Sequence, residues 1–180
     1  MKLTELEHAV LGVVSRRGPC SAYAVQANFE LVSAGWSASP GSVYPLVGKL
    51  CRLGLLSRRE ESWGARGKSL YAITSDGRRE LERWLAEVPD WLGRPPADAI
   101  RTRAFFLDAL PDDAGRLAYV ERAAAVTRAA LDRLERGLAT ADADTSPLER
   151  LGQRGGIHQL RSRLDWLEEL RSHFAGSGET

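Results

Sequence analysis

The 180-residue sequence predicts a mainly α-helical protein in two parts, and three observations support this prediction. Apolar residues recur at the three- and four-residue spacing of amphipathic helices along most of the chain. One short region, residues 55–73, alternates instead and carries glycines that suit a hairpin turn. Residues 89–99 are rich in proline and glycine, which predicts a linker between residues 1–88 and residues 100–176.

The first part opens with two expected helices. Residues 3–17 place leucines and valines on one face, Thr4 can accept a hydrogen bond at the start, and Gly18 ends the run. A second helix is expected from Ser21 to Gly35, because a serine hydroxyl can accept from the otherwise unpaired amides of a first turn.

The third expected helix begins at Ser39, with Pro40 at its first helical position, and ends at Gly54. Pro45 is awkward because a proline inside a helix costs about 3 kcal/mol and crowds the residue four positions earlier. Two solutions are open: that residue is Gly41, which has no side chain to add to the crowding, or the helix starts at Ser42.

A two-stranded ribbon and a fourth helix are expected next. Residues 55–62 and 69–73 contain strand-forming residues, and the turn between them carries two glycines together with Arg66 and Lys68. Thr74 is expected to cap a helix that runs to Val88. Three helices, a ribbon with a cationic tip and a further helix form the order of a winged helix-turn-helix domain.

The charge of this domain favours a nucleic-acid partner. Residues 39–79 contain eight basic and three acidic side chains, and the third helix is expected to present an outward face without an acidic residue. Cations and hydroxyls on such a face can bind phosphates or base edges. The predicted DNA-binding residues are Ser39, Ser42, Tyr44, Lys49, Arg52, Arg66 and Lys68.

The second part is expected to contain helices over residues 100–110, 113–139 and 147–174, with Asp113 as the cap of the second of these. Apolar residues advance along the two long helices by steps of three and four, as in the heptad seam of a coiled coil, and we expect the long helices to form an antiparallel dimerisation domain. Because a two-helix hairpin leaves half of each seam in water, we expect a homodimer; the alternative is that the seams fold back on the first part. The predicted dimerisation residues are Leu117, Val120, Leu131, Leu134, Ile157, Leu160, Leu164 and Leu167.

Other classes of function have little support in the sequence. Cys20 and Cys51 are expected to be packing residues, and no histidine or cysteine cluster has the spacing of a metal site, so we expect no metal, no cofactor and no catalysis. No segment approaches the roughly 20 apolar residues of a membrane span, and the start lacks a secretory pattern, which favours the cytoplasm. Trp84, Trp91 and Trp166 can either line a pocket for a planar ligand or, as the favoured interpretation, pack in cores.

Three stretches of this sequence resemble the PadR family of bacterial transcriptional regulators. They are LTELEHAVLGVVSRRGPCSAYAV at residues 3–25, SPGSVYPLVGKLCRLGLL at residues 39–56 and GKSLYAITSDGRREL at residues 67–81. The second half looks like the larger subtype of this family, whose C-terminal helices dimerise.

The resemblance implies a homodimeric repressor whose third helix enters the major groove of a palindromic operator. It also implies that a small aromatic or drug-like effector relieves repression, and it places Ser42, Tyr44, Lys49 and Lys68 at DNA-contacting positions. Two other functions remain open: a winged helix that binds an acidic protein, and a small-molecule sensor that does not bind DNA. The operator, the regulated gene, the effector and the sign of regulation are not encoded in any motif.

Overall fold

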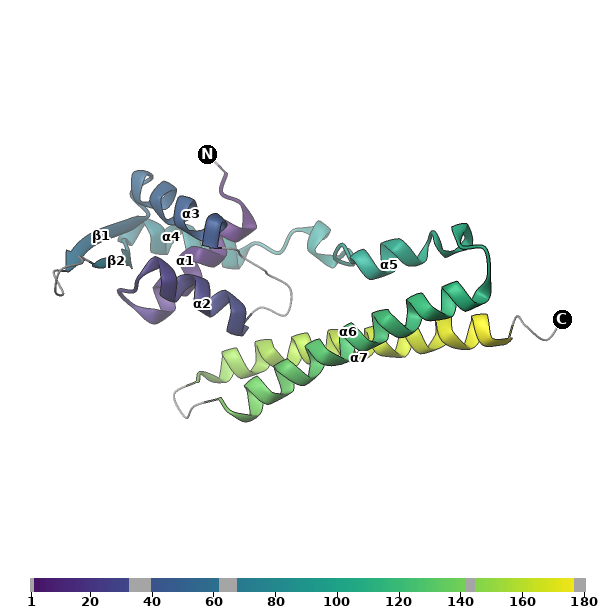
Figure 1. Cartoon of the computed structure of the whole chain (residues 1–180). Helices are drawn as coiled ribbons and strands as arrows, with labels where there is room; N and C mark the ends of the chain where they lie inside the picture. The colour runs from purple at the N-terminus through teal and green to yellow at the C-terminus, as the bar shows by residue number, and fades with distance from the viewer. Residues whose placement is uncertain (1, 33–39, 62–67, 142–144, 177–180) are drawn as a thin grey trace. The chain divides into compact units, whose positions relative to one another are not determined.

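The computed structural model describes residues 2–32, 40–61, 68–141 and 145–176, and the chain forms two compact units, Met1–Gly93 and Arg94–Thr180 (Figure 1). Both units are built from helices, and the first also contains a two-stranded antiparallel sheet. This is the fold class that the sequence predicts. No helix within the described residues has the length and apolar character needed to cross a membrane.

The first unit has the element order of a winged helix-turn-helix domain, as predicted. Its elements are α1 (Glu5–Arg17), α2 (Ala22–Val32), α3 (Pro40–Arg52), β1 (Leu56–Glu61), β2 (Lys68–Ile73) and α4 (Ser75–Ala86). The helix starts use the expected caps: the Thr4 hydroxyl accepts from the Glu7 amide at 3.3 Å and the Thr74 hydroxyl accepts from the Gly77 amide at 3.0 Å. Helix α4 ends two residues before the predicted Val88.

Helix α3 keeps Pro45 inside it. Because the helix already begins at Pro40, the alternative start at Ser42 is wrong. The residue four positions before Pro45 is Gly41, which fits the other solution, since a glycine adds no side chain to the crowded turn.

Backbone hydrogen bonds attach the wing to the start of α2. Strands β1 and β2 pair from Leu56 opposite Ile73 to Glu61 opposite Lys68. The Cys20 amide donates to the Tyr71 carbonyl at 3.0 Å, and the Tyr71 amide donates to the Cys20 carbonyl at 2.8 Å, so Cys20 acts as a one-residue third strand. These bonds hold β2 beside the start of α2, which limits the positions that the wing can take.

One apolar core joins all the helices of the first unit to the base of the wing. Val10, Leu11 and Val14 from α1 meet Val43, Val47 and Leu50 from α3, and all six side chains are fully buried. Gly77 in the first turn of α4 lies against the wing base so closely that a Cβ there would overlap the carbonyl oxygen of Leu55. The apolar core thus determines which face of α3 points inward, and the opposite face stays available to a partner.

The second unit is a helical hairpin with a short leading helix. Its elements are α5 (Ala99–Ala104), the 3-10 turn Leu107–Ala109, α6 (Asp113–Ala139) and α7 (Pro147–Gly176). The predicted helix over residues 100–110 is wrong beyond Ala104, because Arg116 of α6 donates to the Leu107 and Leu110 carbonyls and holds them in a turn. Asp112, and not Asp113, caps α6 by accepting from the Gly115 amide at 2.8 Å.

Helices α6 and α7 lie side by side and run in opposite directions (Figure 1). Four of the predicted dimerisation residues, Val120, Ile157, Leu160 and Leu167, are buried within this single chain. The other four, Leu117, Leu131, Leu134 and Leu164, are half-buried. Each long helix therefore covers part of the other's seam and leaves the rest partly exposed, as expected for a two-helix hairpin, and the role of these residues in pairing two subunits stays a prediction.

Candidate nucleic-acid interface

The outward face of α3 is formed by residues at helical spacing from its first turn to its last. Gly41, Tyr44, Pro45 and Arg52 are exposed, and Tyr44 exposes 52% of its surface. Ser42 is half-buried beside them. An exposed aromatic ring and an arginine on one side of a helix suit contact with a polyanion.

Lys49 does not belong to this open face in the way that the sequence predicts. Its ammonium nitrogen lies 2.5 Å from the Oε1 atom of Glu7 in α1, and the Glu7 side chain is only 2% exposed. Helix α3 itself carries no acidic residue, as predicted, but α1 brings the Glu7 carboxylate to Lys49. Lys49 ties α3 to α1, and its charge is balanced by a buried carboxylate.

Glu7 combines a capping role with this ion pair. Its Oε2 atom accepts from the Thr4 amide at 2.8 Å, while Oε1 accepts from Lys49. Burial alone raises the pKa of Glu7, but the hydrogen bonds from Lys49 and Thr4 outweigh burial and hold this pKa below its usual value. The carboxylate is thus ionised at neutral pH and holds Lys49 in place.

Several other basic residues of the predicted cationic region, residues 39–79, form ion pairs with nearby acidic residues. Arg58 pairs with Glu60 at 2.7 Å, Arg59 pairs with Glu61 at 2.5 Å, and Arg79 pairs with Asp76. Among the described residues of α3, the wing and α4, three exposed cations form no ion pair: Arg52, Lys68 and Arg78. Ser39 and Arg66, which were also predicted to bind DNA, lie outside the described residues.

Gly48 is a feature of the outward face that sequence reasoning missed. It lies between Tyr44 and Arg52 at four-residue spacing, and a Cβ at this position would meet only the flexible end of Arg52, at 3.7 Å. The fold therefore has room for alanine, which also forms helices better by about 1 kcal/mol. A glycine there leaves a shallow gap on the surface of α3. The signal was available in the sequence, as a glycine inside a predicted helix.

A second polar group joins α1 to α4. The His8 ring is buried, with Nδ1 3.1 Å from the Thr4 carbonyl oxygen and Nε2 2.9 Å from Oε1 of Glu80. It stacks on the Trp84 ring at a centroid distance of 5.1 Å. Hydrogen bonds from Arg83 and His8 lower the pKa of Glu80 against the opposing effect of its burial. His8 is thus a core histidine that fixes α4 against α1.

The three tryptophans proposed for a ligand pocket occupy different surroundings. Trp84 packs against the core of the first unit and donates to Oε1 of Glu5 at 3.1 Å. Trp166 packs against the core of the second unit, and Trp91 is 48% exposed in the 3-10 turn Asp90–Gly93. The structure therefore favours the packing interpretation for Trp84 and Trp166.

Comparison with known proteins agrees with this geometry. The model of the "Transcriptional regulator PadR-like family" matches residues 10–83, which include α3 and the wing, and that of "Virulence activator alpha C-term" matches residues 98–174. Residues 10–83 thus carry the domain of PadR-like transcriptional regulators. The PadR resemblance seen in the sequence is confirmed for this domain.

The PadR-like chain is also similar to individual proteins. It is 30% identical over 110 residues to the negative transcriptional regulator PadR of Bacillus subtilis (strain 168), and the match spans 58% of each chain. The crystal structure of Bacillus subtilis PadR with operator DNA superposes with a TM-score of 0.79 at 23% identity, covering 95% of this chain and 99% of that one. PadR with p-coumaric acid gives a TM-score of 0.72 at 23% identity, covering 94% and 98%. These likenesses show that the two parts of the PadR-like chain share the fold of those structures.

Proposed function

We propose that this PadR-like regulator is a homodimeric repressor that binds a palindromic operator and is released by a small aromatic or drug-like effector. Residues 1–88 bind double-stranded DNA, residues 100–176 pair the two subunits, and residues 89–99 link them. The observation that carries this proposal is the outward face of α3, where Tyr44 and Arg52 are exposed opposite a fully buried apolar face.

The DNA contacts are assigned to the cations that no carboxylate neutralises. Arg52 lies at the end of the outward face of α3, Lys68 begins β2 and Arg78 lies in α4. Each can bind a phosphate, and Arg52 can also bind a guanine edge. Tyr44 and Ser42 complete the face, and Ser39 and Arg66 remain proposed contacts at the helix start and the wing tip. Lys49 is reassigned from DNA contact to positioning, because Glu7 holds its ammonium group.

Pairing of two chains is supported by apolar side chains that the second unit leaves in water. They are Phe105, Phe106, Val126, Leu148 and Leu151, each more than half exposed. Exposed aromatic and aliphatic side chains of this number favour a protein partner. A two-fold dimer presents two α3 helices to DNA, and on one face of a duplex their separation approaches one helical turn, roughly 34 Å, or a multiple of it.

The named relative supports the same function. The Bacillus subtilis PadR protein is named a negative regulator and has been crystallised with operator DNA and with p-coumaric acid. By analogy we propose repression and an aromatic effector for this chain. We also propose that the chain is not an enzyme and that it acts in the cytoplasm, where bacterial DNA lies.

Replacing Arg52 and Lys68 together should weaken DNA binding and its dependence on salt. DNA releases about one counterion for each phosphate that a protein cation contacts. The variant R52Q/K68Q lacks two such cations, so we expect its slope of log affinity against log salt to be shallower by about two. At low salt we expect an affinity loss of about ten- to a hundredfold. Fluorescence anisotropy with duplexes selected from a random pool by the wild-type protein measures both quantities.

The matched control is R122Q/R133Q, which removes two exposed arginines of α6 in the second unit. We expect this control to bind the duplex as the wild type does. An equal loss in both variants would mean that total charge, and not this face, governs binding. A wild-type protein with no salt dependence would refute DNA binding and favour a winged helix that contacts a protein.

Gly48→Ala should stabilise the first unit and weaken DNA binding at the same time. Alanine raises the helix stability by about 0.5–1 kcal/mol, while its methyl group fills the gap between Tyr44 and Arg52 where we expect the duplex to approach. Urea unfolding and anisotropy measure the two effects. The control is Gly137→Ala in α6, where the added methyl group meets no atom within 4 Å; it should stabilise the fold without changing affinity. Unchanged DNA binding by Gly48→Ala would show that the duplex does not approach α3 at Gly48.

A further inference from the structure

Strand β1 carries one arginine–glutamate pair on each of its two faces. Because the side chains of a strand alternate between the two faces of a sheet, Arg58 and Glu60 share one face. Arg59 and Glu61 share the other, and the Arg59 guanidinium lies 2.5 Å from Oε1 of Glu61. The first face also contains Leu56, which is buried in the core, so the face of Arg59 and Glu61 is turned away from the core. We call it the outer face of the wing.

Glu61 also faces a cation of the second strand. The pairing register places Lys68 of β2 directly opposite Glu61, and directly opposite residues share a face, with Cβ atoms about 4.5–5.5 Å apart. The Glu61 carboxylate is therefore close to two cations of the outer face, Arg59 along its own strand and Lys68 across the ladder. On the other face, Glu60 lies opposite the uncharged Ser69.

This position of Glu61 affects how strongly the wing can attract DNA. Sequence-independent binding to DNA depends on the number of phosphates that protein cations neutralise. Lys68 is the described residue of the wing that we assign to a phosphate, and the carboxylate opposite it repels that phosphate. The ion pair with Glu61 also occupies Arg59, which is otherwise exposed and able to bind a second phosphate. Glu61 thus opposes two potential phosphate contacts at once.

We propose that Glu61 determines the DNA selectivity of this regulator by keeping the sequence-independent affinity of the wing low. A regulator chooses its operator among a large excess of other sites, so a lower affinity for those sites favours the operator. The choice then depends on the outward face of α3, where Tyr44 and Arg52 can reach base edges. The inference rests on the proposed function, because it concerns the DNA-binding surface of a regulator.

Glu61→Gln tests the proposal in the full-length protein. Fluorescence anisotropy compares the duplex selected by the wild type with an unrelated duplex of equal length. On the unrelated duplex we expect about three- to tenfold tighter binding and a slope of log affinity against log salt steeper by about one per chain, because Arg59 is free to bind a phosphate. On the selected duplex α3 fixes the position of the protein and the gain is smaller, so the ratio of the two affinities should fall by about twofold or more.

The double variant R59Q/E61Q identifies the cation through which Glu61 acts. It has the net charge of the wild type and lacks both members of the ion pair, so we expect it to lose most of the gain seen in Glu61→Gln. An exposed pair of this kind contributes little to stability, and circular dichroism should show both variants folded as the wild type is. A double variant that keeps the full gain would contradict the role of the Arg59–Glu61 pair.

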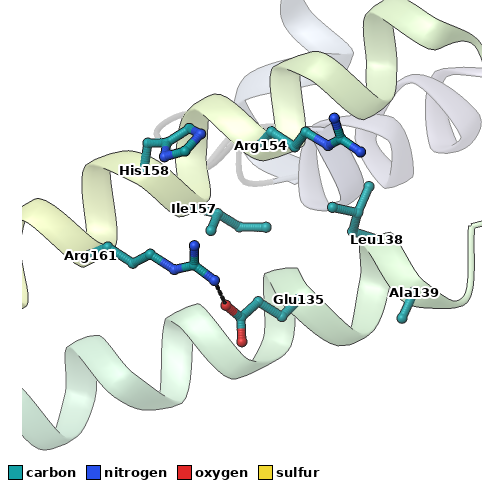
Figure 2. Close-up of a pocket in the computed structure, with 7 residues that line it drawn as sticks. All are labelled: Glu135, Leu138, Ala139, Arg154, Ile157, His158 and Arg161. Atoms are coloured by element: carbon teal, nitrogen blue, oxygen red, sulfur yellow. Dashed lines mark hydrogen bonds and ion pairs between the residues drawn. The ribbon is translucent and has the colours of Figure 1, made fainter.

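Two controls separate this effect from a change in total charge. Glu60→Gln removes a carboxylate from the opposite face of the same strand, and we expect a smaller gain than in Glu61→Gln. Glu135→Gln removes one from the second unit, where Glu135 accepts a hydrogen bond from Arg161 at 2.7 Å (Figure 2). This pair matches the pair in the wing, since the Glu135 side chain is 40% exposed and that of Glu61 is 41% exposed. We expect Glu135→Gln to bind both duplexes as the wild type does.

The outcomes distinguish this inference from the proposed function. If the wild type binds the selected duplex, an affinity of Glu61→Gln for the unrelated duplex equal to that of the wild type, of Glu60→Gln or of Glu135→Gln would overturn the inference alone. Equal gains on the two duplexes would also overturn it, because Glu61 would then lower affinity without changing selectivity. A wild-type protein that binds neither duplex would refute the proposed function and this inference together.

Discussion

Gly77→Ala is expected to unfold much of the first unit at concentrations of urea that leave the wild type folded. The new methyl group would overlap the backbone oxygen of Leu55 and crowd the side chain of Ile73, and backbone atoms cannot rotate away as a side chain does. The first turn of α4 must therefore move away from the base of the wing, and we expect a loss of about 3 kcal/mol or more in the free energy of unfolding.

Urea unfolding, together with hydrogen exchange of peptides from each unit, measures this loss and locates it. We expect faster exchange in β1, β2 and α4 and unchanged exchange in α6 and α7, which form their own core. Gly137→Ala serves as the control, because that position is open. Wild-type stability in Gly77→Ala would mean that the close approach of α4 to Leu55 is not a constraint on the fold.

Lys49→Met is expected to cost about 2–3 kcal/mol of stability in the first unit, although it removes only one partly exposed side chain. The substitution leaves the Glu7 carboxylate buried without its cation, and an unpaired buried charge is costly. Because Lys49 itself is 37% exposed, water reduces the effect below that of a fully buried pair. The double variant E7Q/K49M should recover most of the loss, since a glutamine can still accept from the Thr4 amide.

The pH dependence gives an independent check of this pair. The folded state lowers the pKa of Glu7, so its ionisation stabilises the protein above the unfolded-state value near 4.5, and this contribution is lost as the pH falls through the lower folded value. We therefore expect the wild type to lose stability at acidic pH more steeply than E7Q/K49M. Equal slopes, measured by urea unfolding from neutral to acidic pH, would contradict the role of Glu7.

The duplex affinity of E7Q/K49M distinguishes a positioning role of Lys49 from a direct contact between Lys49 and DNA. If Lys49 only fixes α3 against α1, the double variant should bind the duplex within about threefold of the wild type. A loss of ten times or more, with stability recovered, would mean that Lys49 leaves Glu7 and contacts DNA, as the sequence resemblance implies.

Local signals in the sequence were sufficient for the elements of the first unit. Thr4 and Thr74 begin helices through their hydroxyls, and Pro40 is the first residue of α3, each for a reason that depends on neighbouring residues only. The helix expected over residues 100–110 failed because Arg116, from the next helix, binds the carbonyls of Leu107 and Leu110. Periodicity does not report a contact of this kind.

The candidate DNA-binding face was predicted only in part. Tyr44 and Arg52 are exposed on α3 because the apolar stripe opposite them is buried, and that stripe is visible in the sequence. Whether each cation is neutralised by an ion pair depends on which acidic residue lies close to it in the folded structure. Arg58 and Arg59 meet acids two residues away, whereas Lys49 meets one 42 residues away.

The sequence by itself determined the order of helices and strands, the inward side of α3 and the resemblance to PadR-like regulators, because these depend on spacing and on short motifs. Only the tertiary structure decided that Glu7 pairs with Lys49, that α6 and α7 partly cover one another and that Arg116 binds the carbonyls of Leu107 and Leu110. Each of these depends on which distant segments meet when the chain buries its apolar surface. That choice is made by packing in three dimensions, and a one-dimensional pattern does not contain it.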